Sequence, residues 1–370
     1  MTEKTVKQEK FSACSSGRFR RWLPKTPLAR PWILGLILLI AIIGSLFMGA
    51  YPIPWHRILE ILLNSVWPFS GSESAYLDLR EITVVTLIRP PRILVAVLAG
   101  IALGMSGTAL QGMMRNPLVG PDLVGVTSGA AFGAVLAMWL GFLYTPVILV
   151  LSTIGGIAAM LGTMALARVV GGRNDSLPLI LAGFFIGAFF LAGVGLLIYL
   201  ENPFYPKGQR TGNIIYWLLG TFRGAGPVKA WTIAVPTIVG GTVLMGLRWR
   251  LNLLSLGDLD ASSLGINLNR LRWILITVVS LMVAGQVAVS GVVGWVGLII
   301  PHAARMLVGP DHRRLIPASA MLGGLFVLGL DNFTRTVIWS EVPVGVLSAI
   351  FGTPLICFLF WKTKTKGWNE

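Results

Sequence analysis

Long uncharged runs separated by short polar joints divide most of this chain. The run from Ile93 to Met114 is long enough to cross about 30 Å of hydrocarbon as a helix. Within it, Gly100, Gly104 and Gly107 form a ladder of small residues, which would let a second helix approach closely. The run ends at the polar sequence Arg-Asn-Pro at 115–117, and glycines at similar spacing follow in the next run. The pattern predicts a tightly packed pair of membrane helices in this stretch.

The remaining runs predict further membrane helices, some of them short and broken by glycine and proline. The uncharged stretch 123–167 has a turn near Gly141 to Pro146, so we expect a helical hairpin. The stretch 273–304 is too long for one helix, and its glycines and Pro301 divide it into a full span and a short one. Ten spans are predicted, at 32–51, 93–114, two within 122–168, 177–200, 231–247, two within 273–304, 315–330 and 342–361.

Composition supports an all-α, polytopic membrane protein. The chain is 55% hydrophobic and 12% charged, with a mean hydropathy of +0.77. Its 370 residues leave no room for a separate soluble domain of ordinary size. We expect a basic cytoplasmic tail at 1–30, a membrane domain at 31–362 and a second cytoplasmic tail at 363–370. Cys14 and Cys357 lie far apart, so no disulfide framework or CxxC site is expected.

The distribution of basic residues predicts the topology. The net charge of +15 would suggest nucleic acid in a soluble protein, but basic cytoplasmic loops explain it here. With ten spans, more than two thirds of the 30 lysines and arginines fall in the tails and in the loops after even-numbered spans. The positive-inside rule therefore places both termini in the cytoplasm of a multi-pass plasma-membrane (inner-membrane) protein.

The scarcity of charge inside the spans argues against an ion-coupled carrier, which normally keeps an ionisable group within the bilayer. Asp331, Arg335 and Glu341 cluster at an outer end instead. The chain also lacks GxxxxGK[ST], so it has no P-loop for ATP. The spans offer no paired catalytic groups beyond His302, and no His/Cys/carboxylate cluster suits a metal, so we expect neither an enzyme nor a cofactor. A conduit driven by a motor on another subunit is favoured, with an ion-coupled secondary transporter as the alternative.

The polar segment 250–270 is the best candidate for contact with such a motor. Asp258 is a favourable N-cap, Asp260 suits the first turn, and Gly265 can end a helix in a left-handed conformation. The leucines of this segment are too apolar for a free loop. We expect one short cytoplasmic helix that acts as a lever seated in a groove of an ATPase. The alternative is an interfacial helix that lies on lipid.

Several motifs in fixed order carry a resemblance to a known family. They are RPPR at 89–92, RNPLVGPDLVGVTSGA at 115–130, WLLGTF at 217–222, LNLLSLGDLDASSLG at 251–265, GWVGLIIPHAARMLVGPDHRRLIP at 294–317 and VPVGVLSAIFGTP at 342–354. Over residues 32–362 the chain resembles the FecCD/BtuC-type permeases of ABC importers for iron-siderophores, haem and cobalamin. Pro90 replaces the leucine usual between the two arginines of the first motif.

The resemblance implies ten spans per subunit and a dimer, either of identical chains or with a paralogue, with a pathway between subunits lined by spans 2, 5, 8 and 10. It implies ABC ATPase subunits inside and a substrate-binding protein outside whose glutamates meet arginine pockets. The expected cargo is an iron chelate, most simply a ferric siderophore, with haem, cobalamin or molybdate as alternatives.

Carried over by motif position, three sets of residues receive roles from this resemblance. Binding-protein docking falls on Arg89, Arg92 and Arg335. ATPase coupling falls on Leu251, Leu254, Gly257, Asp258, Ala261, Leu264 and Gly265. The translocation pathway falls on Gly104, Gln111, Asn116 and Pro117, followed by Gly183 and Gly345.

Overall fold

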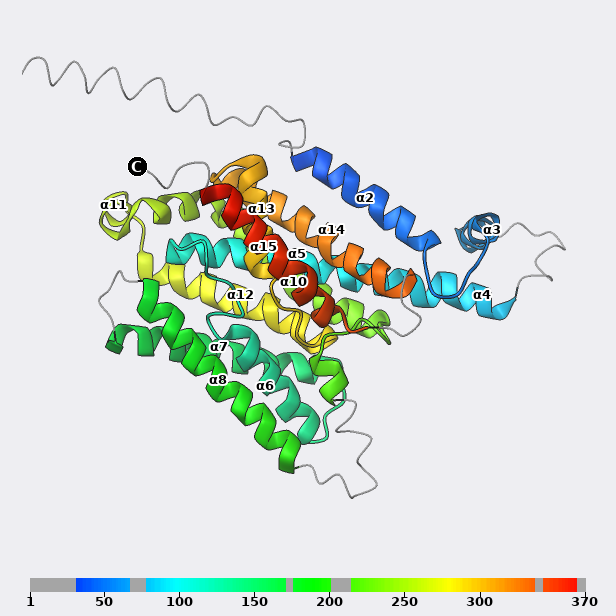
Figure 1. Cartoon of the computed structure of the whole chain (residues 1–370), viewed down its shortest axis with the longest axis horizontal. Helices are drawn as coiled ribbons and strands as arrows, with labels where there is room; N and C mark the ends of the chain where they lie inside the picture. The colour runs from blue at the N-terminus through cyan, green and yellow to red at the C-terminus, as the bar shows by residue number, and fades with distance from the viewer. Residues whose placement is uncertain (1–30, 67–77, 171–175, 201–213, 337–341, 365–370) are drawn as a thin grey trace, which may run out of the picture.

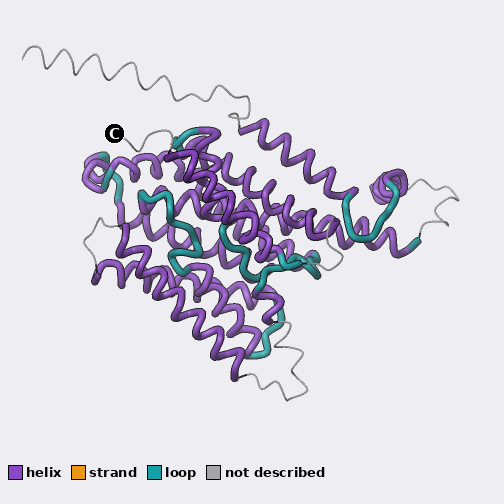
Figure 2. Tube along the Cα trace, in the orientation of Figure 1, coloured by secondary structure: helices purple, strands orange, loops and turns teal. Residues whose placement is uncertain are grey.

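A computed structural model of the chain describes residues 31–66, 78–170, 176–200, 214–336 and 342–364, and these are helical with connecting loops (Figures 1 and 2). The tail predicted at 1–30 lies outside the described residues, and the last helix continues to Lys364, past the predicted start of the other tail. The helices are α2 (Pro31–Phe47), α3 (Trp55–Val66), α4 (Leu79–Thr83), the π-turn η4 (Val84–Ile88), α5 (Arg89–Met114), α6 (Val126–Trp139), α7 (Thr145–Val170), α8 (Ser176–Leu200), α10 (Pro227–Leu256), α11 (Asp258–Ser263), α12 (Leu268–Ser290), α13 (Val296–Val308), α14 (His312–Thr336) and α15 (Val344–Lys364).

The all-α membrane architecture is confirmed. Among the described residues, six helices are long and apolar enough to cross a membrane, and four shorter apolar helices accompany them. The shorter ones are α2, α6, α13 and α15. The two sets together correspond to the ten predicted spans.

The helix at the centre of the bundle is longer than the sequence predicted. The α4, η4 and α5 segments form one continuous helix of 36 residues from Leu79 to Met114, whereas the span predicted from sequence begins at Ile93. Pro90 and Pro91 stand in the first turn of α5, where a missing N–H breaks no bond within that segment. In the preceding π-helix η4 the backbone hydrogen bonds span five residues instead of four. This accommodates the prolines, which lack an N–H, so they do not end the helix.

Glycines bring the backbone of this central helix against its neighbours. A Cβ on Gly100 would lie 2.0 Å from the carbonyl oxygen of Gly323 in α14, and one on Gly107 would lie 1.8 Å from that of Gly297 in α13. The α6–α7 hairpin is joined similarly, because a Cβ on Gly129 would lie 2.3 Å from the Gly155 oxygen. Close packing at the small residues is confirmed, but the predicted pairing of the two helices in this stretch is wrong, because α5 packs on α14 and α13 whereas α6 packs on α7.

The predicted division of residues 273–304 is confirmed, with the break at 291–295 between α12 and α13. Gly291 has φ +71°, and a Cβ there would lie 1.8 Å from the Trp217 carbonyl oxygen, so only glycine fits. Pro301 lies inside α13 and does not end it.

Span 6 continues further than predicted. The α10 helix runs to Leu256 through part of the expected polar interruption. Arg248 and Arg250 are exposed on this extension, while Leu251 and Leu254 are buried against the core. The extension is therefore an amphipathic continuation whose charges mark one face rather than the end of the helix.

The contact between α5 and α14 yields a matched pair of substitutions. Gly323→Ala would place its Cβ 2.1 Å from the Gly100 oxygen, whereas Gly329→Ala on the same helix meets no atom within 4 Å. We expect Gly323→Ala to cost about 1–3 kcal/mol of stability through overpacking. Gly329→Ala should be neutral or slightly stabilising. Thermal unfolding of the purified protein in detergent, followed by tryptophan fluorescence, measures the difference. Equal midpoints for both variants would contradict backbone-to-backbone packing of the two helices.

Candidate functional site

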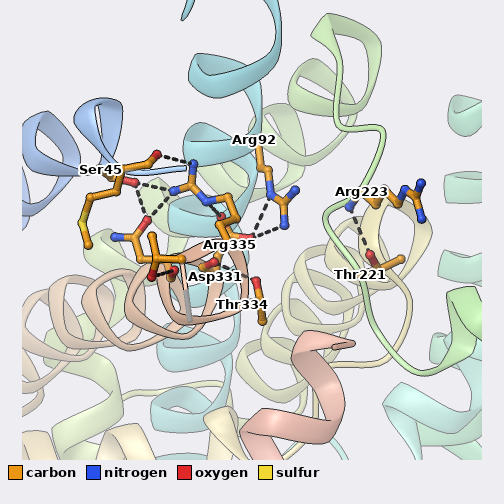
Figure 3. A network of polar contacts seen from close by, with 10 residues as sticks. Ser45, Arg92, Thr221, Arg223, Asp331, Thr334 and Arg335 are labelled. Atoms are coloured by element: carbon orange, nitrogen blue, oxygen red, sulfur yellow. Dashed lines mark hydrogen bonds and ion pairs between the residues drawn. The ribbon is translucent and has the colours of Figure 1, made fainter. Parts of the chain in front are cut away.

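Two arginines share one buried carboxylate at the end of the bundle where α2 finishes, which we call the Asp331 end (Figure 3). Asp331 on α14 has no exposed side-chain surface. Arg92 of α5 donates from Nε and Nη2 to Oδ1, each at 2.9 Å, and Arg335 Nε lies 3.1 Å from Oδ2. An unpaired buried carboxylate would be strongly destabilising, so this pairing fixes α5 to α14.

Arg335 also joins α14 to the end of α2. Its Nη2 donates to Ser45 Oγ at 2.7 Å and contacts Asn332 Oδ1, and Nη1 donates to the Met48 carbonyl at 3.4 Å. Ser45 Oγ in turn donates to Asn332 Oδ1 at 2.6 Å. The guanidinium is therefore surrounded by acceptors of its own chain.

Arg89 belongs to the same end of the bundle and is 4% exposed. Its Nη1 donates to the Leu46 carbonyl at 2.7 Å, and its Nη2 donates to the Tyr51 carbonyl at 2.8 Å. A Cβ on Gly49 would lie 3.0 Å from Nη2, so a glycine leaves room for the guanidinium. Arg89 thus binds one carbonyl in the last turn of α2 and one in the loop that follows it.

The structure thus brings the three predicted docking arginines to one end of the bundle, but their guanidinium groups bind acceptors within the same chain. Arg92 has the most exposed side chain of the two that contact Asp331, at 11% against 5% for Arg335. Arg223, drawn in the same view, is exposed, and its guanidinium points away from Asp331 (Figure 3). The expected proximity of Asp331 and Arg335 is confirmed, whereas Glu341 lies outside the described residues.

The short helix α11 lies at the opposite end of the bundle, the α11 end (Figure 1). The prediction of Asp258 as its N-cap is wrong. Gly257, at φ +131°, occupies the cap, and Asp258 is the first helical residue. Its carboxylate is instead occupied by Arg115 and Arg272. The left-handed ending is confirmed at Gly265, with φ +78°.

The coupling candidates divide into an inner and an outer group. Leu251 and Leu254, at the end of α10, are at most 1% exposed and belong to the core of this chain, and Ala261 of α11 is fully buried, so these residues fix the α10–α11 segment. Leu264 is 59% exposed at the C-terminal end of α11. Among these apolar side chains, Leu264 is the one a partner could contact.

Sequence reasoning missed the two arginines that hold Asp258. Arg115 Nη2 donates to Oδ1 at 2.9 Å, and Arg272 Nη2 donates to both oxygens at 2.9 and 2.8 Å. Arg115 is the C-cap of α5, and Arg272 lies in the first turns of α12. The only local signal was their placement at span ends, which predicts lipid or solvent contact equally well.

A second set of polar contacts links the α10 extension to the start of α14. Asn252 donates to Asp311 Oδ1 at 2.6 Å and accepts from the His312 N–H at 2.8 Å. Burial pushes the pKa of Asp311 up, but hydrogen bonds from the Arg313 N–H and Asn252, with the charges of Arg313 and Arg314, hold the pKa below its ordinary value. Asp311 therefore stays charged and keeps α14 attached to α10.

The predicted pathway residues lie mostly inside the subunit. A Cβ on Gly104 would lie 2.4 Å from the Ser319 oxygen, so this glycine contacts α14. Gln111 accepts from Arg305 at 3.1 Å, and Asn116 accepts from the Leu118 N–H at 2.9 Å.

Pro117 is the exposed member of this set. The glycines named after it also meet backbone of their own chain. A Cβ on Gly183 would lie 2.0 Å from the Leu123 oxygen, and one on Gly345 would lie 2.3 Å from the Leu219 oxygen. These glycines allow close contact between segments.

Asp122 is a further polar residue whose partner the sequence did not reveal. Its Oδ2 accepts from the backbone N–H of Trp295 at 2.9 Å, and Trp295 has φ +69°, which is rare for a bulky residue. The loop after α5 therefore caps the N-terminus of α13 and stabilises its left-handed start. His302, weighed from sequence as a lone polar group, lies within α13. Among the described residues no group of three His, Cys, Asp or Glu could hold a metal.

Comparison with known proteins identifies the class of this bundle. The molybdate import permease MolB of Haemophilus influenzae is 38% identical over 344 residues, which cover 91% of this chain and 96% of that protein. A permease named for iron chelatin transport in Helicobacter pylori is 33% identical over 338 residues, covering 91% and 99%. A solved metal-chelate type ABC transporter in an inward-facing conformation has a TM-score of 0.74 at 35% identity, covering 90% of this chain and 98% of that one.

The match to a described family extends over residues 37–362, from α2 to the last turns of α15. It includes both ion-paired ends of the bundle. The expected resemblance is therefore confirmed: the chain belongs to the FecCD transport family and is a membrane-spanning, non-enzymatic permease of the ABC importer type.

Proposed function

We propose that the chain imports an intact iron chelate, most simply a ferric siderophore, delivered by an external binding protein and driven by ABC ATPase subunits. The observation that supports this cargo is the broad apolar surface of α8. Phe184, Phe185 and Phe189 are 58–72% exposed on that helix. On α15, Ile350 and Phe351 are also exposed.

These two helices correspond to spans 5 and 10, which face the pathway in the family that the chain resembles. A chelate presents the organic shell of its ligand rather than the metal, so a smooth apolar wall can pass it with weak binding. A bare oxyanion would favour N–H donors and positive charge along its path. We infer that the α8 and α15 faces of two subunits, identical or paralogous, enclose the pathway.

Molybdate is the second candidate cargo, because the molybdate permease MolB is 38% identical to this chain. The binding protein would then present an oxyanion instead of a chelate. The apolar wall would then offer the oxyanion no favourable contact, and selectivity would depend on the binding protein.

The orientation follows from charge. The α11 end carries Arg115, Arg168 and Arg272 at or near helix ends. The positive-inside rule assigns this end, and both termini, to the cytoplasm, so the Asp331 end faces outward. We propose that α11 enters a groove of the ATPase, with Leu264 at the contact, and that the binding protein docks at the Asp331 end.

The cargo is tested by uptake into proteoliposomes that contain the permease, its ATPase and its binding protein. We expect ATP-dependent accumulation of radioactive iron supplied as a ferric trihydroxamate chelate, because the apolar wall suits an organic ligand shell. Radioactive molybdate is the parallel probe. Accumulation of molybdate but not of the ferric chelate would overturn the siderophore assignment. Accumulation driven by an ion gradient without ATPase would overturn the proposed mechanism.

The docking site is tested at Arg92, the more exposed of the two arginines that contact Asp331. Arg92→Gln should weaken binding of the binding protein to nanodisc-embedded permease about tenfold, since it removes a charged group at the proposed contact. Arg92→Lys should lose less. Surface plasmon resonance gives the Kd, and the unfolding midpoint reports any loss of folding. Arg80→Gln, at an exposed position on α4, is the control. A Kd equal to that of Arg80→Gln would argue against docking at Arg92.

The ATPase contact is tested at Leu264. Because Leu264 is 59% exposed, Leu264→Glu should leave the fold intact but place a charge in the proposed groove. We expect at least about tenfold weaker association with the ATPase, the loss typical of a central interface residue. Co-purification from detergent measures it. Leu143→Glu, at a 66% exposed position in the α6–α7 turn, is the matched control. Full retention of ATPase by Leu264→Glu would remove α11 as the docking element.

A further inference from the structure

The ion pairs of Asp258 join α11 to the end of α5, which is 143 residues away in the sequence, and to α12, the next helix along the chain. Arg115 follows the last residue of α5, Asp258 begins α11, and Arg272 belongs to α12. Each of the two guanidiniums lies within 2.9 Å of the carboxylate. We call these three residues the Asp258 node. A movement of α11 therefore acts directly on the ends of α5 and α12.

Backbone geometry presents these groups to one another. Arg115 adopts a left-handed conformation, φ +51°, which is uncommon for a residue with a side chain. Its N–H donates to the Gln111 carbonyl and closes α5 at that point. On the other side, Gly257 at φ +131° turns the chain sharply between α10 and α11. The Arg115 guanidinium packs against this turn, since a Cβ on Gly257 would lie 3.7 Å from Nη1.

The exposure of the node indicates that stability is not its main contribution. The side chains of Arg115, Asp258 and Arg272 are 34%, 26% and 24% exposed. Ion pairs that are this accessible contribute little to folding. Burial of Ala261 on α11, and of Leu251 and Leu254 at the end of α10, already fixes this segment. What the node adds is a directional, charge-specific connection from α11 to two transmembrane helices.

The first of these helices extends the connection to the other end of the bundle. The continuous helix ending in α5 has 36 residues, which is about 54 Å at the rise of an α-helix. Arg92, 22 residues or about 33 Å before Met114, pairs with Asp331 of α14, and between these two points Gly100 meets the backbone of Gly323. Displacing the Arg115 end should thus move α5 and α14 together, because close packing leaves no slack between them.

The second helix joined to the node, α12, leads to the interruption at 291–295 and so to α13. Arg272 lies near the start of α12, which ends at Ser290, and Gly291 then turns the chain toward α13. Asp122, in the loop that follows Arg115, accepts from the N–H of Trp295 at the start of α13. Both routes from the node therefore reach α13, one through α12 and one through the loop after α5.

We propose that Asp258, with Arg115 and Arg272, is the positioning node that transmits movement of α11 to α5 and α12 during transport. The inference rests on the proposed contact between α11 and the ATPase. It assigns to the arginines a role in coupling ATP hydrolysis to transport rather than in assembly. Losing one pair should therefore let ATP be hydrolysed without movement of cargo.

The test measures solute transported per ATP hydrolysed in proteoliposomes containing the complete complex. The solute is whichever probe the wild type accumulates, ferric trihydroxamate or molybdate, so an error in the cargo does not affect the ratio. Arg115→Gln and Arg272→Gln should each lower the ratio about tenfold while the ATPase still co-purifies. Arg115→Lys, which keeps the charge, should recover most of it. The double variant Arg115→Gln/Asp258→Asn should have the same ratio as Asp258→Asn alone, because both substitutions break the same ion pair.

Arg168→Gln removes one exposed arginine near the C-terminus of α7 and is the control for charge alone. A wild-type ratio in both Arg115→Gln and Arg272→Gln would overturn the node. If either variant fails to assemble, the other variant and Arg115→Lys decide the question. A ratio in Arg115→Lys as low as in Arg115→Gln would show that geometry other than the ion pair is responsible, and would also overturn it.

Discussion

The contact on which the structure depends is the direct meeting of two helix backbones, α5 and α14, at Gly100 and Gly323. In a bilayer, helices gain nothing by hiding apolar side chains from lipid, so close van der Waals contact must hold them together. With no Cβ on either residue, the helices approach closely enough for Arg92 to reach Asp331. The central helix can then serve as one rigid element between the two ends of the bundle.

The helices were largely predictable because a membrane span has to be apolar over a fixed length. The division of residues 273–304 followed from its glycines, and Gly291 does turn the chain there. The length of the helix that contains span 2 was underestimated, because hydropathy does not predict how far a helix continues beyond its apolar residues. Its first turns, from Leu79, carry Arg80 and Glu81, which composition alone assigns to a loop. The extension of α10 past Arg248 was missed for the same reason.

The ion pairs could not be predicted, because sequence separation carries no information about which charges meet. Arg92 and Asp331 are 239 residues apart, and Arg115 and Asp258 are 143 apart. Asp258 shows the limit of local rules. An aspartate at a helix start is favourable both as a cap and beside the N-terminal dipole. The carboxylate of Asp258 instead pairs with Arg115 at the end of the distant α5 and with Arg272 of the next helix, and Gly257 occupies the cap position of α11.

Both ends of the bundle use one arrangement with different exposure. At the Asp331 end the carboxylate is fully buried, so its two arginines mainly prevent the cost of an isolated charge and fix α14 on α5. At the α11 end the carboxylate is a quarter exposed, and water can replace either arginine at small cost. The ion pairs at the Asp331 end should therefore persist, while those at the α11 end can exchange partners. Because the backbones of α5 and α14 are in contact, the two helices would then tilt together and keep their packing. Exposure, rather than the identity of the charged residues, distinguishes the structural ion pair from the one suited to movement.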